Sequence, residues 1–277
     1  MYPKSTIASA VASTLLTPGS IIMVASEATI VENVIVTSAA PKNVTIMGCI
    51  DGAYQPTWAG AANAGVCLTL RQQSWRVAGF HFIGPGGDTG ACIRVEWDGT
   101  DTVNASYALI DHNVFDGQWG GKFGLTHWGS PYSVRVLNNI FQEFKHGDAT
   151  GSAIYGETAP TANALEWIIA GNIFWLNENH VKSLANDNGF NCSLIANNYF
   201  HAGAAAGMIT TVLKLDLRGG STGENIVAGN IFAGADYSNV GGFYGSAATA
   251  DTWVGNFSPD VAEATVDPGG LTILPPA

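Results

Sequence analysis

The chain has 277 residues, of which 47% are apolar and only 12% are charged, and 34 of them are glycine. This apolar content supports a packed core and excludes a disordered chain. The net charge of −11 argues against a nucleic-acid partner, and no apolar run approaches the roughly 18 residues of a membrane span. The abundance of glycine, asparagine, threonine and serine predicts many short strands joined by turns.

The first predicted element is a helix over residues 5–16, with Ser5 as its N-cap. Apolar residues share one face of it at i, i+4 spacing: Ile7, Val11 and Leu15. The Pro18-Gly19 pair ends the helix, and a first strand follows at 21–24. We expect residues 1–20 to cap the stack that follows. They lack the features of a signal peptide, so we expect a virion or extracellular protein released by another route, such as cell lysis.

One six-residue pattern recurs from the middle of the chain to its end. Its copies are Ile110–Phe115, Val136–Phe141, Ile169–Phe174, Ile195–Phe200 and Val227–Phe232, with degenerate forms at Val77–Phe82 and Val254–Phe257. The key position runs from Phe80 through Asn113 to Asn256 in steps of 33, 26, 33, 26, 32 and 26 residues. Such steps are typical of a solenoid whose coils carry extra residues in loops on one side.

The pattern predicts an all-β fold, a right-handed parallel β-helix of about eight coils over residues 21–257. The phenylalanines would stack into an internal column, and the asparagines would form a ladder that pairs their buried amides. A β-sandwich with Greek-key connections is the alternative, but it predicts no matched residues at near-equal spacing. Residues 258–277 are rich in proline and would form an extended tail.

The cysteines and histidines show no metal-binding spacing. We expect the four cysteines to be small buried apolar side chains, with a Cys49–Cys67 bridge between neighbouring coils as the alternative: Cys49, Cys67, Cys92 and Cys192. No metal site and no cofactor are predicted from the sequence motifs.

The opening helix, the strand at 21–24, the coil at 43–48 and coils such as Ile110-Asp-His-Asn-Val-Phe115 resemble the pectate-lyase-like β-helix superfamily. This resemblance extends over nearly the whole chain and implies the β-helix fold. It implies no single function, because the superfamily includes polysaccharide lyases, rhamnogalacturonases and phage tailspikes and fibres. In such coils the Asp111-His112 pair commonly supports structure, and we expect the two side chains to bond within the turn.

The long insertions follow the phenylalanine positions, so the loops and the strands after them should form one face. Strands at 124–129, 152–157, 181–186 and 212–218 would lie on adjacent coils. Their aromatic and charged side chains would suit the rings and hydroxyls of sugars. The predicted carbohydrate-binding residues are Trp119, His127, Trp128, Lys145, His146, Tyr155, Glu157 and Glu178.

Lys182 and Arg218 resemble the Lys-then-Arg arrangement of chondroitinase B-like alginate lyases, with Asn197-Asn-Tyr-Phe200 between them. The resemblance implies β-elimination from an acidic polysaccharide, in which a base takes the C5 proton and a cation stabilises the developing charge. Lys182, Arg218 and His180 would be the catalytic residues, and Ca²⁺ the cofactor. The chain departs from that family at the expected calcium ligands, where residues 177–180 are Asn-Glu-Asn-His.

A glycosidase would instead use two carboxylates roughly 5–10 Å apart. Acidic residues on neighbouring coils offer such pairs: Glu143, Asp148, Glu157, Glu178 and Asp187. The incomplete calcium pattern and the missing signal peptide favour a third function, a non-catalytic phage-type virion or surface protein. It would serve as a decoration, fibre or spike that binds a polysaccharide or cell-surface glycan, beside other virion proteins and as a homotrimer. The lyase is the first alternative and the glycosidase the second.

Overall fold

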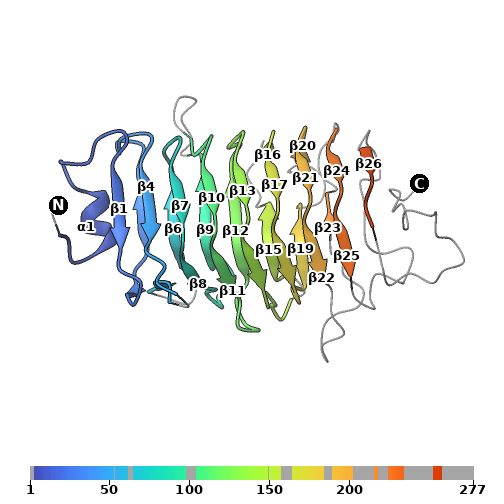
Figure 1. Cartoon of the computed structure of the whole chain (residues 1–277), viewed down its shortest axis with the longest axis horizontal. Helices are drawn as coiled ribbons and strands as arrows, with labels where there is room; N and C mark the ends of the chain where they lie inside the picture. The colour runs from blue at the N-terminus through green and yellow to red at the C-terminus, as the bar shows by residue number, and fades with distance from the viewer. Residues whose placement is uncertain are drawn as a thin grey trace, which may run out of the picture.

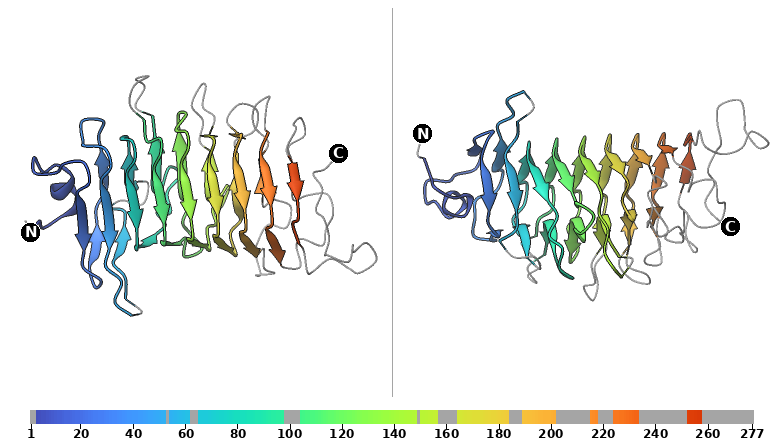
Figure 2. Two further views of the ribbon diagram at one scale, coloured as in Figure 1. Left: turned by 45° about the horizontal axis from the view of Figure 1, so that its top comes forward. Right: turned by 90° about the horizontal axis from the view of Figure 1, so that it is seen from below.

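The computed structural model describes residues 3–52, 54–61, 65–97, 104–148, 150–156, 164–183, 189–201, 215–217, 224–233 and 252–257. Regular structure in these ranges is almost entirely short β-strand. The strands stack along one axis from the N-terminal to the C-terminal end, so the described part is an elongated right-handed parallel β-helix (Figures 1 and 2). Within these ranges no helix is long and apolar enough to cross a membrane.

Three parallel sheets run along the stack. Sheet A pairs β1 (Ile21–Val24), β4 (Thr45–Gly48), β7 (Arg76–Ala78), β10 (Leu109–Asp111), β13 (Arg135–Leu137), β17 (Ile168–Ala170), β21 (Leu194–Ala196), β24 (Ile226–Ala228) and β26 (Thr252–Val254). Sheet B pairs β2 (Thr29–Val31), β5 (Thr57–Ala59), β8 (His81–Ile83), β11 (Val114–Asp116), β14 (Ile140–Gln142), β18 (Ile173–Trp175), β22 (Tyr199–His201) and β25 (Ile231–Ala233). Sheet C pairs β3 (Val34–Val36), β6 (Val66–Leu70), β9 (Ala91–Glu96), β12 (Phe123–Trp128), β15 (Ser152–Gly156), β19 (Asn179–Lys182) and β23 (Leu215–Asp216). A two-stranded sheet joins β16 (Ala164–Leu165) to β20 (Phe190–Asn191).

A column of aromatic rings fills the interior behind sheet B. Its members are fully buried and lie at equivalent positions of successive coils: Trp58, Phe82, Phe115, Phe141, Phe174, Phe200 and Phe232. The phenylalanine rings stack nearly parallel, with centroids as close as 4.5 Å between Phe115 and Phe141. The predicted internal column is confirmed, and it begins one coil earlier than predicted because Trp58 stacks on Phe82.

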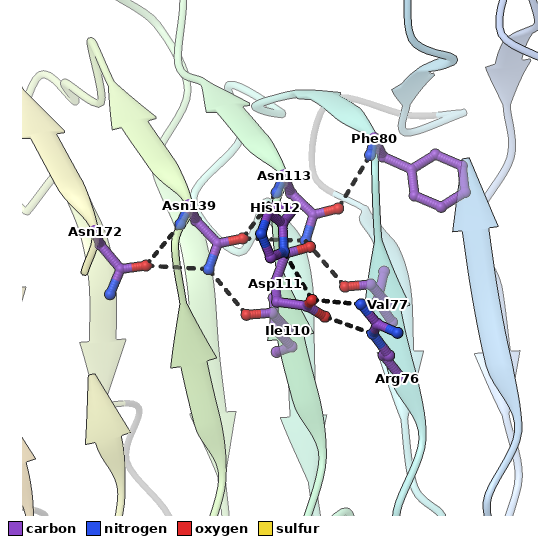
Figure 3. Close-up of polar contacts among 9 residues, drawn as sticks. All are labelled: Arg76, Val77, Phe80, Ile110, Asp111, His112, Asn113, Asn139 and Asn172. Atoms are coloured by element: carbon purple, nitrogen blue, oxygen red, sulfur yellow. Dashed lines mark hydrogen bonds and ion pairs between the residues drawn. The ribbon is translucent and has the colours of Figure 1, made fainter. Parts of the chain in front are cut away.

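The asparagine ladder lies at the bend between sheets A and B (Figure 3). Asn139 Oδ1 accepts hydrogen bonds from Asn113 N at 2.9 Å and from Asn113 Nδ2 at 3.1 Å, while Asn139 Nδ2 donates to Ile110 O at 2.9 Å. The same pattern continues through Asn172 and onwards to Asn256. The ladder amides are therefore hydrogen-bonded, and these bonds offset the free-energy cost of burying them. The predicted ladder is confirmed.

The residue before each ladder asparagine has a left-handed backbone. These positions are His112, Asn138, Gly171, Asn197, Gly229 and Gly255, and Gly79 takes the same conformation before Phe80. Glycine and asparagine tolerate a positive φ best, which explains the Gly-Asn and Asn-Asn pairs of the repeat. A side chain on Gly171 would also collide with Oδ1 of Asn138 in the preceding coil. Glycine and asparagine thus alternate because one coil's amide occupies the space beside the next coil's α-carbon.

Asp111 and His112 bond to each other at this bend, as predicted: His112 Nδ1 lies 2.8 Å from Asp111 Oδ2 (Figure 3). Arg76 from the preceding coil donates to both oxygens of the same carboxylate, at 2.8 and 2.6 Å. This bidentate pair joins two coils of sheet A and accounts for the buried Asp111 without a catalytic role.

The N-terminal helix is shorter than predicted. The helix α1 spans Ile7–Val11, and its N-cap is Thr6, whose hydroxyl accepts a hydrogen bond from Ser9 N at 3.0 Å. The predicted span of 5–16 and the Ser5 cap are wrong, because Thr6 and Ser9 form a reciprocal capping box. Ile7 and Val11 are buried as predicted, and α1 lies at the N-terminal end of the stack (Figure 1).

The four cysteines are free, so no Cys49–Cys67 bridge forms. Cys67 and Cys92 are buried in the core as predicted, and burial raises the pKa of Cys67 to about 12. Cys192 is exposed, which contradicts the prediction for that residue. It occupies a turn position with a positive φ. The predicted tail at 258–277 lies outside the described residues.

Candidate functional site

The outward face of sheet C carries the candidate site. The strands expected on adjacent coils are found there as β12, β15, β19 and β23, which confirms their alignment. One register position runs straight across the sheet and joins Arg94, Thr126, Tyr155, Lys182 and Asp216. We call this set the sheet C row. Arg94, Tyr155 and Lys182 are half-buried at this position, whereas Thr126 is fully buried. Residues one step earlier in each strand, such as Leu125 and Ile154, are fully buried in the core.

His180 lies inside the helix rather than on this face. Its side chain is fully buried, and its ring centroid is 5.8 Å from that of Phe174 and 5.5 Å from that of Phe200. The strands of sheet C place two consecutive residues in the interior at this level, as Ala153 and Ile154 do in the preceding coil. The prediction that His180 is catalytic is therefore wrong, because a ring in the aromatic core cannot reach a substrate.

His127 is also interior. It is fully buried, with its ring 5.6 Å from Trp167 and 5.9 Å from Phe190, and its Nδ1 lies 3.3 Å from Gly129 O. Desolvation by burial lowers the pKa of His127 to about 4. The prediction that it binds carbohydrate is wrong, because strand alternation from Leu125 points it inward.

Glu178 organises a loop instead of contacting a ligand. Its side chain is buried, and Oε2 accepts hydrogen bonds from His146 N at 3.1 Å and Gly151 N at 2.8 Å. These bonds hold the two ends of the loop that precedes β15. The predicted sugar-binding role of Glu178 is wrong for this reason. Lys145 is half-buried on the same loop, and its backbone N donates to Gly121 O at 3.1 Å.

Aromatic side chains do gather on the face. The rings of Phe123 and Tyr155 stack on neighbouring coils, with centroids 4.5 Å apart and planes 9° apart. Trp128 at the end of β12 is 39% exposed. Trp119 is 42% exposed on the turn after β11, but it does not line the hollow described next. The structure therefore brings Trp128 and Tyr155 together and leaves Trp119 apart.

A hollow of about 190 Å³ lies beside this aromatic pair. It is lined by Asp88, Thr89, Lys122, Phe123, Trp128, Thr150 and Tyr155. A larger space of about 840 Å³ lies between α1 and the first coil, at the N-terminal end, and shares no residue with it. The smaller hollow is the one that adjoins the predicted binding residues.

Charged side chains border the hollow on one side. Lys122 Nζ lies 3.1 Å from Asp148 Oδ2, and His146 bridges two carboxylates, with Nδ1 2.7 Å from Asp148 and Nε2 3.4 Å from Asp88. Partial desolvation raises the pKa of Asp148, but hydrogen bonds from Thr150, His146 and Lys122 together outweigh it and hold that pKa well below its usual range. Asp148 is therefore ionised at any ordinary pH.

Asp88, His146 and Asp148 are the described residues that could ligate a metal, with ligand atoms within 4.8 Å of one another. The set does not suit the Ca²⁺ expected for a lyase. Calcium takes about six to eight oxygen ligands, whereas this group offers an imidazole and two carboxylates. The Lys122 ammonium also already neutralises Asp148. No step below uses a metal at this position.

Lys182 differs from Lys122 in its surroundings. It is half-buried at the end of β19, and no carboxylate among the described residues forms an ion pair with it. Its neighbours in register are Tyr155 on one side and Asp216 on the other. Arg218, Glu157 and Asp187 lie outside the described residues, so the structure places none of these three predictions.

Asp88, Thr89 and Thr150 were not predicted from sequence. A signal for them exists in the similarity of Gly87-Asp-Thr-Gly-Ala-Cys-Ile and Gly147-Asp-Ala-Thr-Gly-Ser-Ala-Ile, which precede or enter β9 and β15. Equivalent loops two coils apart thus place Asp88 and Asp148 on the same border of the face.

No protein-family model and no curated protein matches the sequence. Among solved structures, a mannuronic acid specific polysaccharide family 6 lyase from human gut microbiota is 14% identical, with a TM-score of 0.49 over 93% of this chain and 63% of that one. A mutant of the PL6 family alginate lyase AlyGC is 15% identical, with a TM-score of 0.49 over 91% of this chain and 37% of that one. The DFA-IIIase from Arthrobacter chlorophenolicus A6 is 14% identical, with a TM-score of 0.41 over 91% of this chain and 82% of that one.

The three parallel sheets and the asparagine ladder decide the fold family. The chain is a right-handed parallel β-helix. It spans less than two thirds of the length of the two lyases. The parallel β-helix fold alone assigns no activity, so function has to come from the side chains of its exposed faces.

Proposed function

We propose that the outward face of sheet C binds an acidic polysaccharide and that the chain cleaves it by β-elimination. The observation that carries this proposal is the register pair of Tyr155 and Lys182 on that face. Neighbouring parallel strands are about 4.8 Å apart, so an amine and a phenol stand side by side above one sugar linkage.

In this mechanism Lys182, in its neutral form, accepts the C5 proton of a uronate residue. The electron pair of the C5–H bond becomes the C4=C5 double bond as the C4–O4 bond breaks. The Tyr155 hydroxyl donates its proton to the departing O4. Exchange with solvent then removes the proton from Lys182 and restores that of Tyr155. Positioned acid–base groups of this kind typically contribute about 10²–10⁴-fold to a rate.

The same face supplies the binding contacts that elimination needs. The stacked Phe123–Tyr155 pair and Trp128 offer apolar surface to a sugar, and Arg94 adds a cation to the sheet C row. Arg218, predicted to stabilise the developing charge, follows the described Leu217 in sequence and remains a prediction.

The test is incubation with alginate, polygalacturonate and chondroitin, followed by the ultraviolet absorbance of the new C=C bond. The wild-type chain should release unsaturated ends from at least one of them, and Lys182→Ala should lower the rate about a hundredfold or more. Lys42→Ala is the matched control. Lys42 is exposed in the loop before β4, and its side chain donates a hydrogen bond to Gln73. Equal rates for the two variants would remove Lys182 from the mechanism.

Non-catalytic glycan display is the second candidate, favoured by the hollow beside Lys122, which can hold a sugar without Lys182. Binding of a polysaccharide with no unsaturated product would establish it. The virion partners and the homotrimer predicted from sequence stay predictions that particle association and light scattering would test.

The glycosidase has less support. Asp148 is held ionised and so cannot act as a general acid, and Glu178 is buried in backbone hydrogen bonds. Glu143 is the one described acid of the predicted set whose pKa is raised, by desolvation and by the nearby Asp116. It lies at the bend after β14, away from the hollow's lining.

A further inference from the structure

The hollow adjoins the proposed reaction centre. Tyr155 lines the hollow, and its register partner in the next coil is Lys182. A sugar in the hollow would therefore be a close neighbour, along the polysaccharide, of the residue whose C5 proton Lys182 removes. The type of sugar that binds in the hollow therefore determines which sugar can neighbour the reacting uronate in the substrate.

The cations beside the hollow already have acceptors. The Lys122 side chain is only 8% exposed, and its ammonium is bound to Asp148. Arg94 directs a guanidinium nitrogen at Thr89 O, 3.5 Å away. A buried or half-buried cation that is already paired has little attraction left for a second anion.

Two carboxylates at the hollow would repel an acidic ligand. Asp148 is ionised, and the Asp88 side chain is 86% exposed at the rim, with His146 between them. His146 adds positive charge only when it is protonated. Lys182 lies one coil beyond Tyr155 and outside the lining of the hollow. The cations beside the hollow itself are the paired Lys122 and Arg94, which equal the two carboxylates in number. A sugar carboxylate would gain no net attraction and would meet like charge at the rim.

Sugar hydroxyls, in contrast, fit every group on this border. Asp88 and Asp148 accept hydrogen bonds, the Lys122 ammonium donates, and the hydroxyls of Thr89 and Thr150 can do both. Trp128 and Tyr155 supply the apolar contact that a sugar ring needs on its C–H face.

We infer that the hollow binds an uncharged sugar residue, so that the substrate is a polysaccharide in which uncharged sugars accompany the uronates. This inference rests on the proposed function, because Lys182 is what requires the neighbouring uronate. It narrows the substrate class from any acidic polysaccharide to a mixed one, and it disfavours polymers in which every residue is charged.

The experiment compares two probes on the Lys182→Ala chain, which prevents turnover. Hyaluronan alternates a uronate with an uncharged N-acetylhexosamine, and polymannuronate carries a carboxylate on every residue. Dissociation constants are measured by calorimetry at one fixed salt concentration. Hyaluronan should bind more tightly. Asp88→Lys, which places a cation at the rim, should shift the ratio of the two constants towards polymannuronate by roughly two- to fivefold.

Asp51→Lys is the control, because it makes the same change of net charge at an exposed residue in the loop after β4. It should leave the ratio unchanged. Tighter binding of polymannuronate by the parent chain, or an equal ratio in Asp88→Lys and Asp51→Lys, would overturn the inference while leaving the acidic-glycan site in place. Binding of neither probe would overturn the inference together with the proposed function.

Discussion

Acidification should destabilise the fold through the buried His127. Its imidazole has a pKa of about 4 in the folded chain, against an ordinary value of 6.5. The unfolded chain therefore binds a proton that the folded chain does not, between pH 6.5 and about 4. Stability falls as pH drops through this window, and it is fully present above it.

The size of the effect follows from the pKa difference. One pKa unit corresponds to about 1.4 kcal/mol, so the fall from 6.5 to about 4 amounts to roughly 3 kcal/mol of unfolding free energy. Asp148 does not contribute in the same window. The stabilisation that its lowered pKa provides is lost only as the pH falls below the ordinary value of 3.8. The two groups are thus separable by pH.

Urea unfolding of the wild-type chain and of His127→Gln, measured from pH 7 to pH 4, tests this reasoning. The wild type should lose roughly 3 kcal/mol more than the variant over that range, because glutamine does not titrate. His112→Gln serves as the control, since His112 is 60% exposed at its side chain and should leave the extra loss in place. Parallel curves for the wild type and His127→Gln would refute the argument from burial.

Two further predictions concern the ladder. Asn172→Leu should cost about 3–5 kcal/mol in urea unfolding, because it leaves the Asn139 donors without their buried acceptor. Asn138→Gly is the control, because Asn138 is exposed and glycine also tolerates its positive φ, and it should cost less than about 1 kcal/mol. Equal costs would contradict the ladder. Gly171→Ala should cost about 1–2 kcal/mol from its positive φ, and more from the collision with Asn138. Adding Asn138→Gly should recover the collision part, and strict additivity of the two changes would show that no collision exists.

The fold was predictable because its defining residues repeat. The pair Asn139 and Phe141 recurs at the same spacing in the coils from Asn113 to Phe232, since each of these coils meets its neighbour through the same hydrogen bonds and ring contacts. The helix over 5–16 was less predictable. Its apolar spacing allowed a longer element, and only the capping box at Thr6 and Ser9 fixes where it starts.

The site was only partly predictable. Lys182, Tyr155 and Trp128 do lie on the expected face. His180 was misplaced because the strands of sheet C put two successive side chains inside, which breaks the simple alternation that a sequence pattern assumes. The polar character of His127 predicted a surface position, but its neutral ring is packed among aromatic residues in the interior.

The hollow could not be predicted from the repeat, because it is formed by loops that lie outside the repeated pattern. Asp88 and Asp148 come from equivalent loops two coils apart, and only the folded chain brings both to His146. The similarity of those loops in sequence was a usable signal, but the pairing of Asp148 with Lys122 was not visible in it.

The central claim, cleavage by elimination on the sheet C face, is tested most directly by the mass of the fragments released from an acidic polysaccharide. Elimination predicts fragments whose new ends are unsaturated and lighter by one water than hydrolysis products, with their release depending on Lys182. Saturated fragments, or an intact polymer that remains bound to the chain, would contradict the account.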